Sequence, residues 1–145
     1  MTRLYPFILV CLGACIQPAT SSSGSGAGTD SSSFGCHEDS DCPEVCARDG
    51  ECLPASQVEL VHVTWTLSGA AASATTCASS PDLDITFGTS TGSFGFSPVP
   101  CVEGKFTIDK IPTRYVTVSL FKTDSDYGAV TTIDRTRSAV LDLPY

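Results

Sequence analysis

The sequence predicts an all-β protein, in which a small disulfide-rich segment precedes a sandwich of seven short strands. From residue 58 onward, apolar and polar side chains alternate in short runs that are rich in β-branched and aromatic residues, as in half-buried strands. Clusters of Gly, Pro and Ser separate these runs, and no window has the sustained 3.6-residue apolar period of an amphipathic helix. The chain also has 8 cysteines in 145 residues, which indicates an oxidising compartment where cysteines pair.

Length and charge limit the functions that the chain can have. A chain of 145 residues has room for one globular domain with appendages. Its 16 acidic and 8 basic residues give a formal net charge of −8. Such a chain lacks the basic surface that phosphate backbones require, so we expect no nucleic-acid partner.

Residues 1–14 are predicted to be a secretory signal peptide. Arg3 supplies a positive charge, and an apolar run follows over residues 4–12. The run is too short for a membrane span of about 20 residues, but it fits the roughly 7–15 residues of a signal peptide's apolar region. The alternatives are a cleaved signal peptide that leaves Cys15 unmodified and a buried hydrophobic segment.

The signal ends in Leu12-Gly13-Ala14-Cys15, which resembles the lipobox of bacterial lipoproteins. The resemblance implies cleavage before Cys15 and acylation of that cysteine, including by palmitate, so that the protein is anchored to a membrane by lipid. Ile16 stands where Asp would favour retention in the inner membrane, so the resemblance implies the outer membrane, on its periplasmic or surface face. Cys11 follows a bulky Val10 and is expected to leave with the signal peptide.

A tether is predicted to follow the lipidated N-terminus, over residues 15–34. Residues 19–33 are only Ala, Thr, Ser, Gly and Asp, and such chains behave as flexible coils. This length holds the rest of the protein roughly 20 Å from the bilayer on average.

Residues 35–54 are predicted to form a disulfide-rich mini-domain. Four cysteines, Cys36, Cys42, Cys46 and Cys52, occur in 17 residues that contain almost no other apolar side chain. So short a segment needs disulfides or a metal to fold, and the spacing alone leaves all three pairings open. The pattern DSDCP…C…DGEC resembles short cysteine-rich repeats of secreted and bacterial surface proteins, related to half of an epidermal-growth-factor-like module. That resemblance implies the pairs Cys36–Cys46 and Cys42–Cys52.

Two metals compete with this interpretation. Zinc could use the four thiolates and His37, but the C-x2-C spacing of strong zinc motifs is absent. Calcium could use carboxylates, but the EF-hand spacing is absent, and we expect these side chains to form a solvated acidic surface: Glu38, Asp39, Asp41, Glu44, Asp49 and Glu51. We therefore predict no metal and no cofactor.

Residues 57–145 are predicted to form the β-sandwich. The expected strands cover residues 58–67, 83–87, 93–96, 105–108, 114–121, 129–133 and 139–143. Seven short strands in this length fit a sandwich of immunoglobulin-like size, and residues 69–78 are expected to form a short helical turn at most. Once Cys15 is acylated and the small cluster pairs internally, Cys77 and Cys101 remain to form a disulfide, which contributes roughly 3–3.5 kcal/mol.

Within this region, the stretch Gly104-Lys-Phe-Thr-Ile-Asp-Lys-Ile-Pro-Thr-Arg-Tyr115-Val-Thr-Val-Ser-Leu120 resembles carboxypeptidase regulatory-like domains. This family has a transthyretin-like sandwich and includes the B-type repeats of collagen adhesins. The pattern places Phe106 and Ile108 inward and turns the chain at Ile111-Pro112. Tyr115 is expected to bury its ring and to reach backbone atoms with its hydroxyl.

The sequence offers no catalytic constellation, and we predict no catalytic residue. The chain has two histidines, His37 and His62, and each is expected to be an exposed polar residue. The acidic pairs Asp82/Asp84 and Asp124/Asp126 lie in or beside loops without the aromatic platforms of a sugar cleft.

The sequence therefore favours a membrane-anchored, non-catalytic lipoprotein of the cell envelope, acting as a binding or structural module toward an envelope protein or glycan. One alternative is a lipoprotein enzyme that acts on an envelope substrate. The other is a calcium-stabilised adhesin-like module.

Overall fold

The computed structural model describes residues 35–123 and 125–144. The predicted signal peptide, Cys15 and the tether lie outside the described residues. The described part contains no helix with the length and apolar character needed to cross a membrane.

The segment from Gly35 to Pro54, called the Cys-rich segment below, is built around two short strands and two disulfides. The 3-10 helix η1 (Asp39–Asp41) precedes β1 (Val45–Cys46), which pairs antiparallel with β2 (Cys52–Leu53). Disulfides join Cys36 to Cys46 and Cys42 to Cys52, which are the pairs that the resemblance implied. Because the segment is too short for a hydrophobic core, these two disulfides and the β1–β2 ladder stabilise its fold instead.

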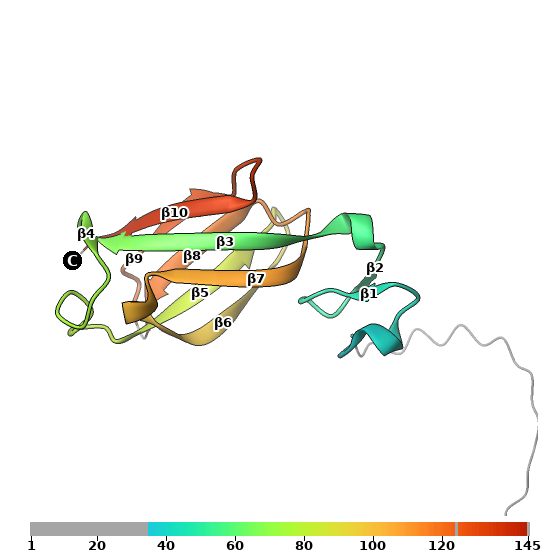
Figure 1. Cartoon of the computed structure of the whole chain (residues 1–145), viewed down its shortest axis with the longest axis horizontal. Helices are drawn as coiled ribbons and strands as arrows, with labels where there is room; N and C mark the ends of the chain where they lie inside the picture. The colour runs from blue at the N-terminus through green and yellow to red at the C-terminus, as the bar shows by residue number, and fades with distance from the viewer. Residues whose placement is uncertain (1–34, 124, 145) are drawn as a thin grey trace, which may run out of the picture. The chain divides into compact units, whose positions relative to one another are not determined.

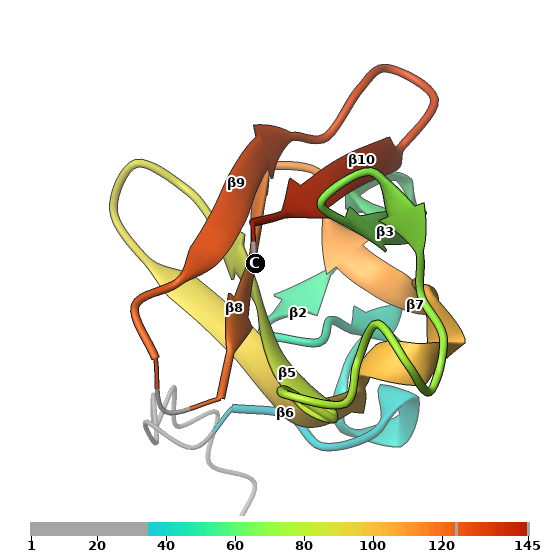
Figure 2. The same ribbon diagram turned by 90° about the vertical axis from the view of Figure 1, so that its left-hand side faces the viewer.

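The rest of the described chain is sandwich-like and all-β. After the 3-10 helix η2 (Ala55–Gln57), the strands form two layers, which are separate in the view of Figure 2. The first layer contains β3 (Val58–Leu67), β4 (Ala70–Ala71), β7 (Lys105–Pro112) and β10 (Ser138–Leu143). The second contains β5 (Asp82–Gly88), β6 (Ser93–Pro100), β8 (Thr117–Lys122) and β9 (Gly128–Thr132).

In the first layer, β3 is the central strand (Figure 1). It pairs with β10 in parallel and with β4 and β7 antiparallel. The second layer has the order β6-β5-β8-β9, with every pair antiparallel. The 3-10 helix η3 (Cys101–Glu103) connects the two layers between β6 and β7, and Gly104 closes it in the left-handed conformation (φ 63°) that glycine adopts without steric cost.

The core lies between the layers and is filled from both inner faces. Along β3 the side chains of Val61, Val63, Trp65 and Leu67 are buried, and the intervening residues face outward, as the alternation predicts. They meet buried side chains of the second layer, which include Leu83, Ile85, Phe87, Val118 and Leu120. This packing joins the two layers into one apolar core.

The Cys77–Cys101 disulfide lies inside this core, with both residues almost fully buried. The indole Nε1 of Trp65 donates a hydrogen bond of 3.0 Å to the Cys101 carbonyl oxygen. A buried indole N–H needs such an acceptor, so the tryptophan and the disulfide position each other.

Each predicted strand run overlaps an observed strand, but the run from residue 114 was placed too early. The observed strand begins at Thr117, because Pro112 leads into a turn in which the Tyr115 N–H donates to the Pro112 carbonyl oxygen. Val116 lies in this connection, outside the strand, and is 51% exposed. Between residues 69 and 78 the chain forms the two-residue β4 and hydrogen-bonded turns.

Candidate functional site

The candidate site is the junction at which the Cys-rich segment lies against β7, and it begins with a β-bulge. The β3–β7 register places Glu59 opposite Ile111 and Val61 opposite Ile108, so β7 carries one extra residue between these pairs. Lys110 in the bulge has a φ of 57°, a left-handed conformation that is uncommon for a residue with a side chain. Bulges re-aim side chains at a strand edge, and here both bulge residues reach the Cys-rich segment.

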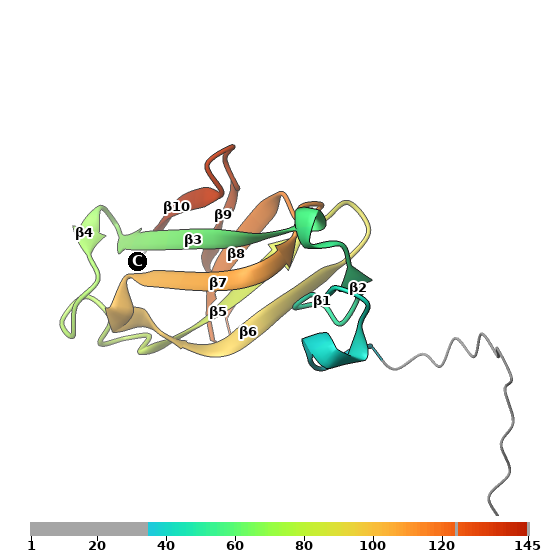
Figure 3. The same cartoon turned by 45° about the vertical axis from the view of Figure 1, so that its right-hand side comes forward.

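Arg48, in the turn between β1 and β2, makes the first set of contacts with the bulge. Figure 3 shows this pair of strands near the end of β7. Its backbone N–H donates to the Lys110 carbonyl oxygen at 3.1 Å, and its guanidinium forms an ion pair with the Asp109 carboxylate. The hydrogen bond from Arg48 holds the pKa of the Asp109 carboxyl below its usual range. One residue of the Cys-rich segment thus binds β7 through both its backbone and its side chain.

Lys110 makes the second set of contacts. Its Nζ lies 2.8 Å from both carboxylate oxygens of Asp39, and Asp39 Oδ1 also accepts the backbone N–H of Cys46 at 3.0 Å. The Lys110 hydrogen bond, followed by that from Cys46, lowers the pKa of the Asp39 carboxyl. Asp39 therefore connects the bulge directly to a disulfide-bonded residue of the Cys-rich segment.

Arg114, in the turn after β7, makes the third set. It forms ion pairs with Asp49 and, at 2.9 Å, with Glu51. The Asp49 side chain is only 8% exposed, whereas that of Glu51 is 58% exposed. The Arg114 guanidinium also lies over the Tyr115 ring, 5.4 Å from its centroid, within the range of a cation–π contact.

Tyr115 differs from our expectation in one respect. Its ring is buried and packs edge-to-face on Phe94 with centroids 4.7 Å apart. Its hydroxyl, which we expected to reach backbone atoms, instead faces the Asp49 carboxylate and the Arg114 guanidinium. Burial, reinforced by the Asp49 charge, raises the pKa of the Tyr115 hydroxyl, so the hydroxyl stays neutral.

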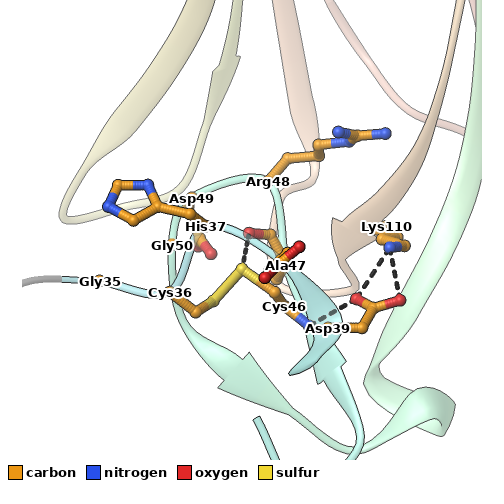
Figure 4. A pocket seen from close by; sticks show the side chains of 11 residues that line it. Gly35, Cys36, His37, Asp39, Cys46, Ala47, Arg48, Asp49, Gly50 and Lys110 are labelled. Atoms are coloured by element: carbon orange, nitrogen blue, oxygen red, sulfur yellow. Dashed lines mark hydrogen bonds and ion pairs between the residues drawn. A yellow bond between two sulfur atoms is a disulfide. The ribbon is translucent and has the colours of Figure 1, made fainter. Parts of the chain in front are cut away.

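A pocket of about 440 Å³ opens between these contacts (Figure 4). Gly35, Cys36, Gly50 and the Cys36–Cys46 disulfide line it, together with charged side chains from both sides of the junction. In Figure 4 the Lys110–Asp39 pair lies on one side of the pocket and the His37 ring on the other. The charged side chains that line the pocket and have defined contacts hold the segment to β7 and to the turn after it: Asp39, Arg48, Asp49 and Lys110.

The other acidic residues of the Cys-rich segment also have structural contacts. The Asp41 carboxylate accepts backbone hydrogen bonds from His37 and Glu38, which lower its pKa. Glu44 Oε2 accepts the Ala55 N–H at 2.8 Å. The surface that we expected to be merely solvated therefore makes specific bonds, several of them to the sandwich.

The remaining candidate residues lie apart from the junction. His62 is exposed on the outer face of β3, with Nδ1 3.2 Å from the Thr107 hydroxyl. The Asp84 carboxylate accepts hydrogen bonds from the hydroxyls of Ser97 and Thr123. Asp82 and Asp126 are exposed, and Asp124 lies outside the described residues.

The two disulfides of the Cys-rich segment are close neighbours. The Sγ atoms of Cys36, Cys42 and Cys46 lie within 4.8 Å of one another. All three are engaged in disulfides, so in this state they are not available as metal ligands. Cys52 is exposed and lines a second, smaller groove with Pro43, Glu44, Leu53 and Pro54.

Comparisons of the chain with protein-family models, with curated proteins and with solved structures found no match. The residues that the sequence did not reveal as important are those of the junction on the sandwich side, above all Asp109, Lys110 and Arg114. The one local feature that marks them in the sequence is that these charged residues flank the predicted turn at Ile111-Pro112.

Proposed function

We propose that this protein is a lipid-anchored, non-catalytic lipoprotein of the cell envelope, and that its sandwich serves as a binding or structural module. The observation that carries the proposal is the sequence Leu12-Gly13-Ala14-Cys15 at the end of a short apolar run. Acyl chains on Cys15 contribute about 0.8 kcal/mol for each buried CH₂ group, and more than one chain makes the anchoring stable.

Two features of the fold support this proposal. The three disulfides suit an oxidising compartment outside the cytosol. The inner faces of the sandwich are filled by apolar side chains, and the charges at the junction form ion pairs between two parts of the same chain. A rigid module exposes its loops and outer faces to an envelope protein or glycan.

We also propose that the sandwich is of the carboxypeptidase regulatory-like, transthyretin-like kind. The support comes from the stretch between Gly104 and Leu120: Ile108 and Ile111 are buried, Phe106 packs against the core, and Tyr115 is buried after the Pro112 turn. An experimental structure that showed β3 and β10 unpaired, or β7 in the layer of β5, would contradict this assignment.

The decisive experiment for the anchor compares Cys15→Ser with Cys11→Ser. We expect Cys15→Ser to move the protein from the membrane fraction to the soluble fraction and to remove the acyl mass from the intact protein. Cys11→Ser is the matched control, and it should change neither the membrane association nor the acyl mass of the protein. Continued membrane association of the Cys15→Ser protein would refute lipid anchoring at this residue.

A further inference from the structure

We propose that the Cys-rich segment is a thiol–disulfide exchange unit whose substrate is an external dithiol. The dithiol attacks the Cys42–Cys52 disulfide, and the released Cys42 then attacks the Cys36–Cys46 disulfide beside it. This inference concerns residues 35–54 alone and does not depend on the lipid anchor.

The first argument is accessibility. Cys52 is exposed and lies at a groove of about 210 Å³ whose lining is mostly apolar. An approaching thiolate can therefore reach the Cys52 side chain. The Cys77–Cys101 disulfide is the opposite case, because its residues are only 2% and 0% exposed. Thiol–disulfide exchange depends on access to the attacked sulfur, and this difference directs attack to the Cys-rich segment.

The second argument is the distance between the two disulfides. Cys42 Sγ lies within 4.8 Å of both Cys36 Sγ and Cys46 Sγ. Reacting atoms need to approach to about 3–3.5 Å. Opening the Cys42–Cys52 bond frees the Cys42 side chain to rotate, and such a rotation readily covers the remaining 1–2 Å or so.

The exchange balances without any further reagent. One thiolate of the dithiol bonds to Cys52, and the Cys42–Cys52 bond breaks to leave a Cys42 thiolate. This thiolate bonds to one sulfur of the Cys36–Cys46 pair and expels the other as a thiolate. The second thiol of the dithiol then displaces Cys52, so that the dithiol is oxidised to its disulfide and the protein gains two electrons as two thiols.

The exchange would act on the junction. Cys46 is the residue whose N–H binds Asp39, and Asp39 holds Lys110 in the bulge. Cys36 is bound by its N–H to the Gly50 carbonyl oxygen at 2.8 Å, next to Asp49. Loss of the Cys36–Cys46 bond therefore loosens the part of the segment that docks on the sandwich.

The test is limited reduction of the mature full-length protein in detergent, followed by alkylation and peptide mapping. Dithiothreitol is the probe because it carries no charge besides that of the attacking thiolate. The segment has six carboxylates and one arginine and would repel a thiol with further negative charge. We expect label on Cys52 and on either Cys36 or Cys46, with roughly tenfold less on Cys42, because intramolecular attack has a high effective concentration. Cys77 and Cys101 should stay unlabelled.

Equal labelling of Cys42 and Cys52, with the Cys36–Cys46 bond intact, would overturn the proposal. The matched variant is Cys36→Ser/Cys46→Ser, which removes the target of Cys42. In this variant Cys42 and Cys52 should be labelled equally, and a variant as poorly labelled at Cys42 as the wild type would also overturn the proposal. The wild-type mapping decides the matter by itself if the variant does not fold.

Discussion

Asp49 is the residue that fixes the Cys-rich segment to the sandwich most specifically. Its carboxylate pairs with Arg114 and faces the Tyr115 hydroxyl while being nearly buried. Asp49→Asn leaves Arg114 with only the exposed carboxylate of Glu51, so it should lower the free energy of unfolding by about 1–3 kcal/mol. Trp65, the single tryptophan, provides the fluorescence signal for denaturant unfolding.

Glu51→Gln is the matched control, because Glu51 pairs with the same arginine but is largely exposed. We expect a change within about 0.5 kcal/mol. Equal losses for the two variants would mean that the burial of Asp49 contributes nothing to the docking.

The ion pairs of the bulge also give a pH dependence. The pKa values of Asp39 and Asp109 are lowered in the folded protein by Lys110 and Arg48. The unfolded chain, with carboxyl pKa values of about 4, therefore binds more protons at low pH than the folded protein does. The stability that these pairs contribute is present above that pH and is lost as the pH falls through the folded values.

Calorimetry of wild type and Asp39→Asn checks this dependence. The variant should melt at a lower temperature at pH 7, and the two melting temperatures should converge as the pH falls below the lowered folded pKa of Asp39, where the carboxyl is protonated in both states. Glu103→Gln removes an exposed charge from η3, away from the junction, and should follow the wild type at every pH. If the difference in melting temperature between Asp39→Asn and the wild type persisted at low pH, the cause would be packing and not the ion pair.

At the scale of elements, the Cys77–Cys101 disulfide should be the main covalent contribution to the sandwich. It closes a loop with a sequence separation of 24 residues and lies against Trp65. Cys77→Ala/Cys101→Ala should lower the free energy of unfolding by about 3 kcal/mol, measured by Trp65 fluorescence. Cys42→Ser/Cys52→Ser removes a disulfide outside the core and should have a smaller effect; the reverse order would contradict this account.

The strands were predictable because their signal is local. In β3, alternate residues from Val61 to Leu67 are buried, and a period of two in the sequence is sufficient to show it. The start of β8 and the exposure of Val116 were not predictable in this way, because the turn after Pro112 interrupts a pattern that otherwise continues. The β7 bulge also escaped detection, because it is a mismatch of register between strands about 50 residues apart.

At the scale of the whole molecule, the docking of the Cys-rich segment was not predictable from the sequence. Its acidic residues have the composition of a solvated surface, and their partners are remote: Lys110 is 71 residues from Asp39, and Arg114 is 65 residues from Asp49. Nothing in a single sequence indicates which remote cation pairs with which carboxylate. The disulfide pairs of the same segment were expected only through the resemblance to cysteine-rich repeats.

The core indicates that the sandwich folds without the Cys-rich segment. The residues of the main apolar cluster run from Val61 to Leu143, and the junction adds ion pairs that are mostly exposed. A fragment of residues 54–145 should therefore unfold cooperatively with Trp65 buried. Its free energy of unfolding should be about 2–3 kcal/mol lower than that of the full chain, from the half-buried pair of Asp49 with Arg114 and a few exposed pairs. This loss corresponds to a melting temperature lower by roughly 10–15 °C.

Salt provides the control for the origin of that difference. Ion pairs at the surface are screened when the Debye length falls to about 3 Å at 1 M salt. Calorimetry in low salt and in 1 M NaCl should therefore show the gap between full chain and fragment narrowing, because the full chain loses the contributions of its exposed pairs. If salt did not change the difference in melting temperature between the full chain and the fragment, the cause would be apolar contacts around Cys46 and Ala47, which are buried. A fragment that failed to fold in either condition would show that the Cys-rich segment is part of the folding unit.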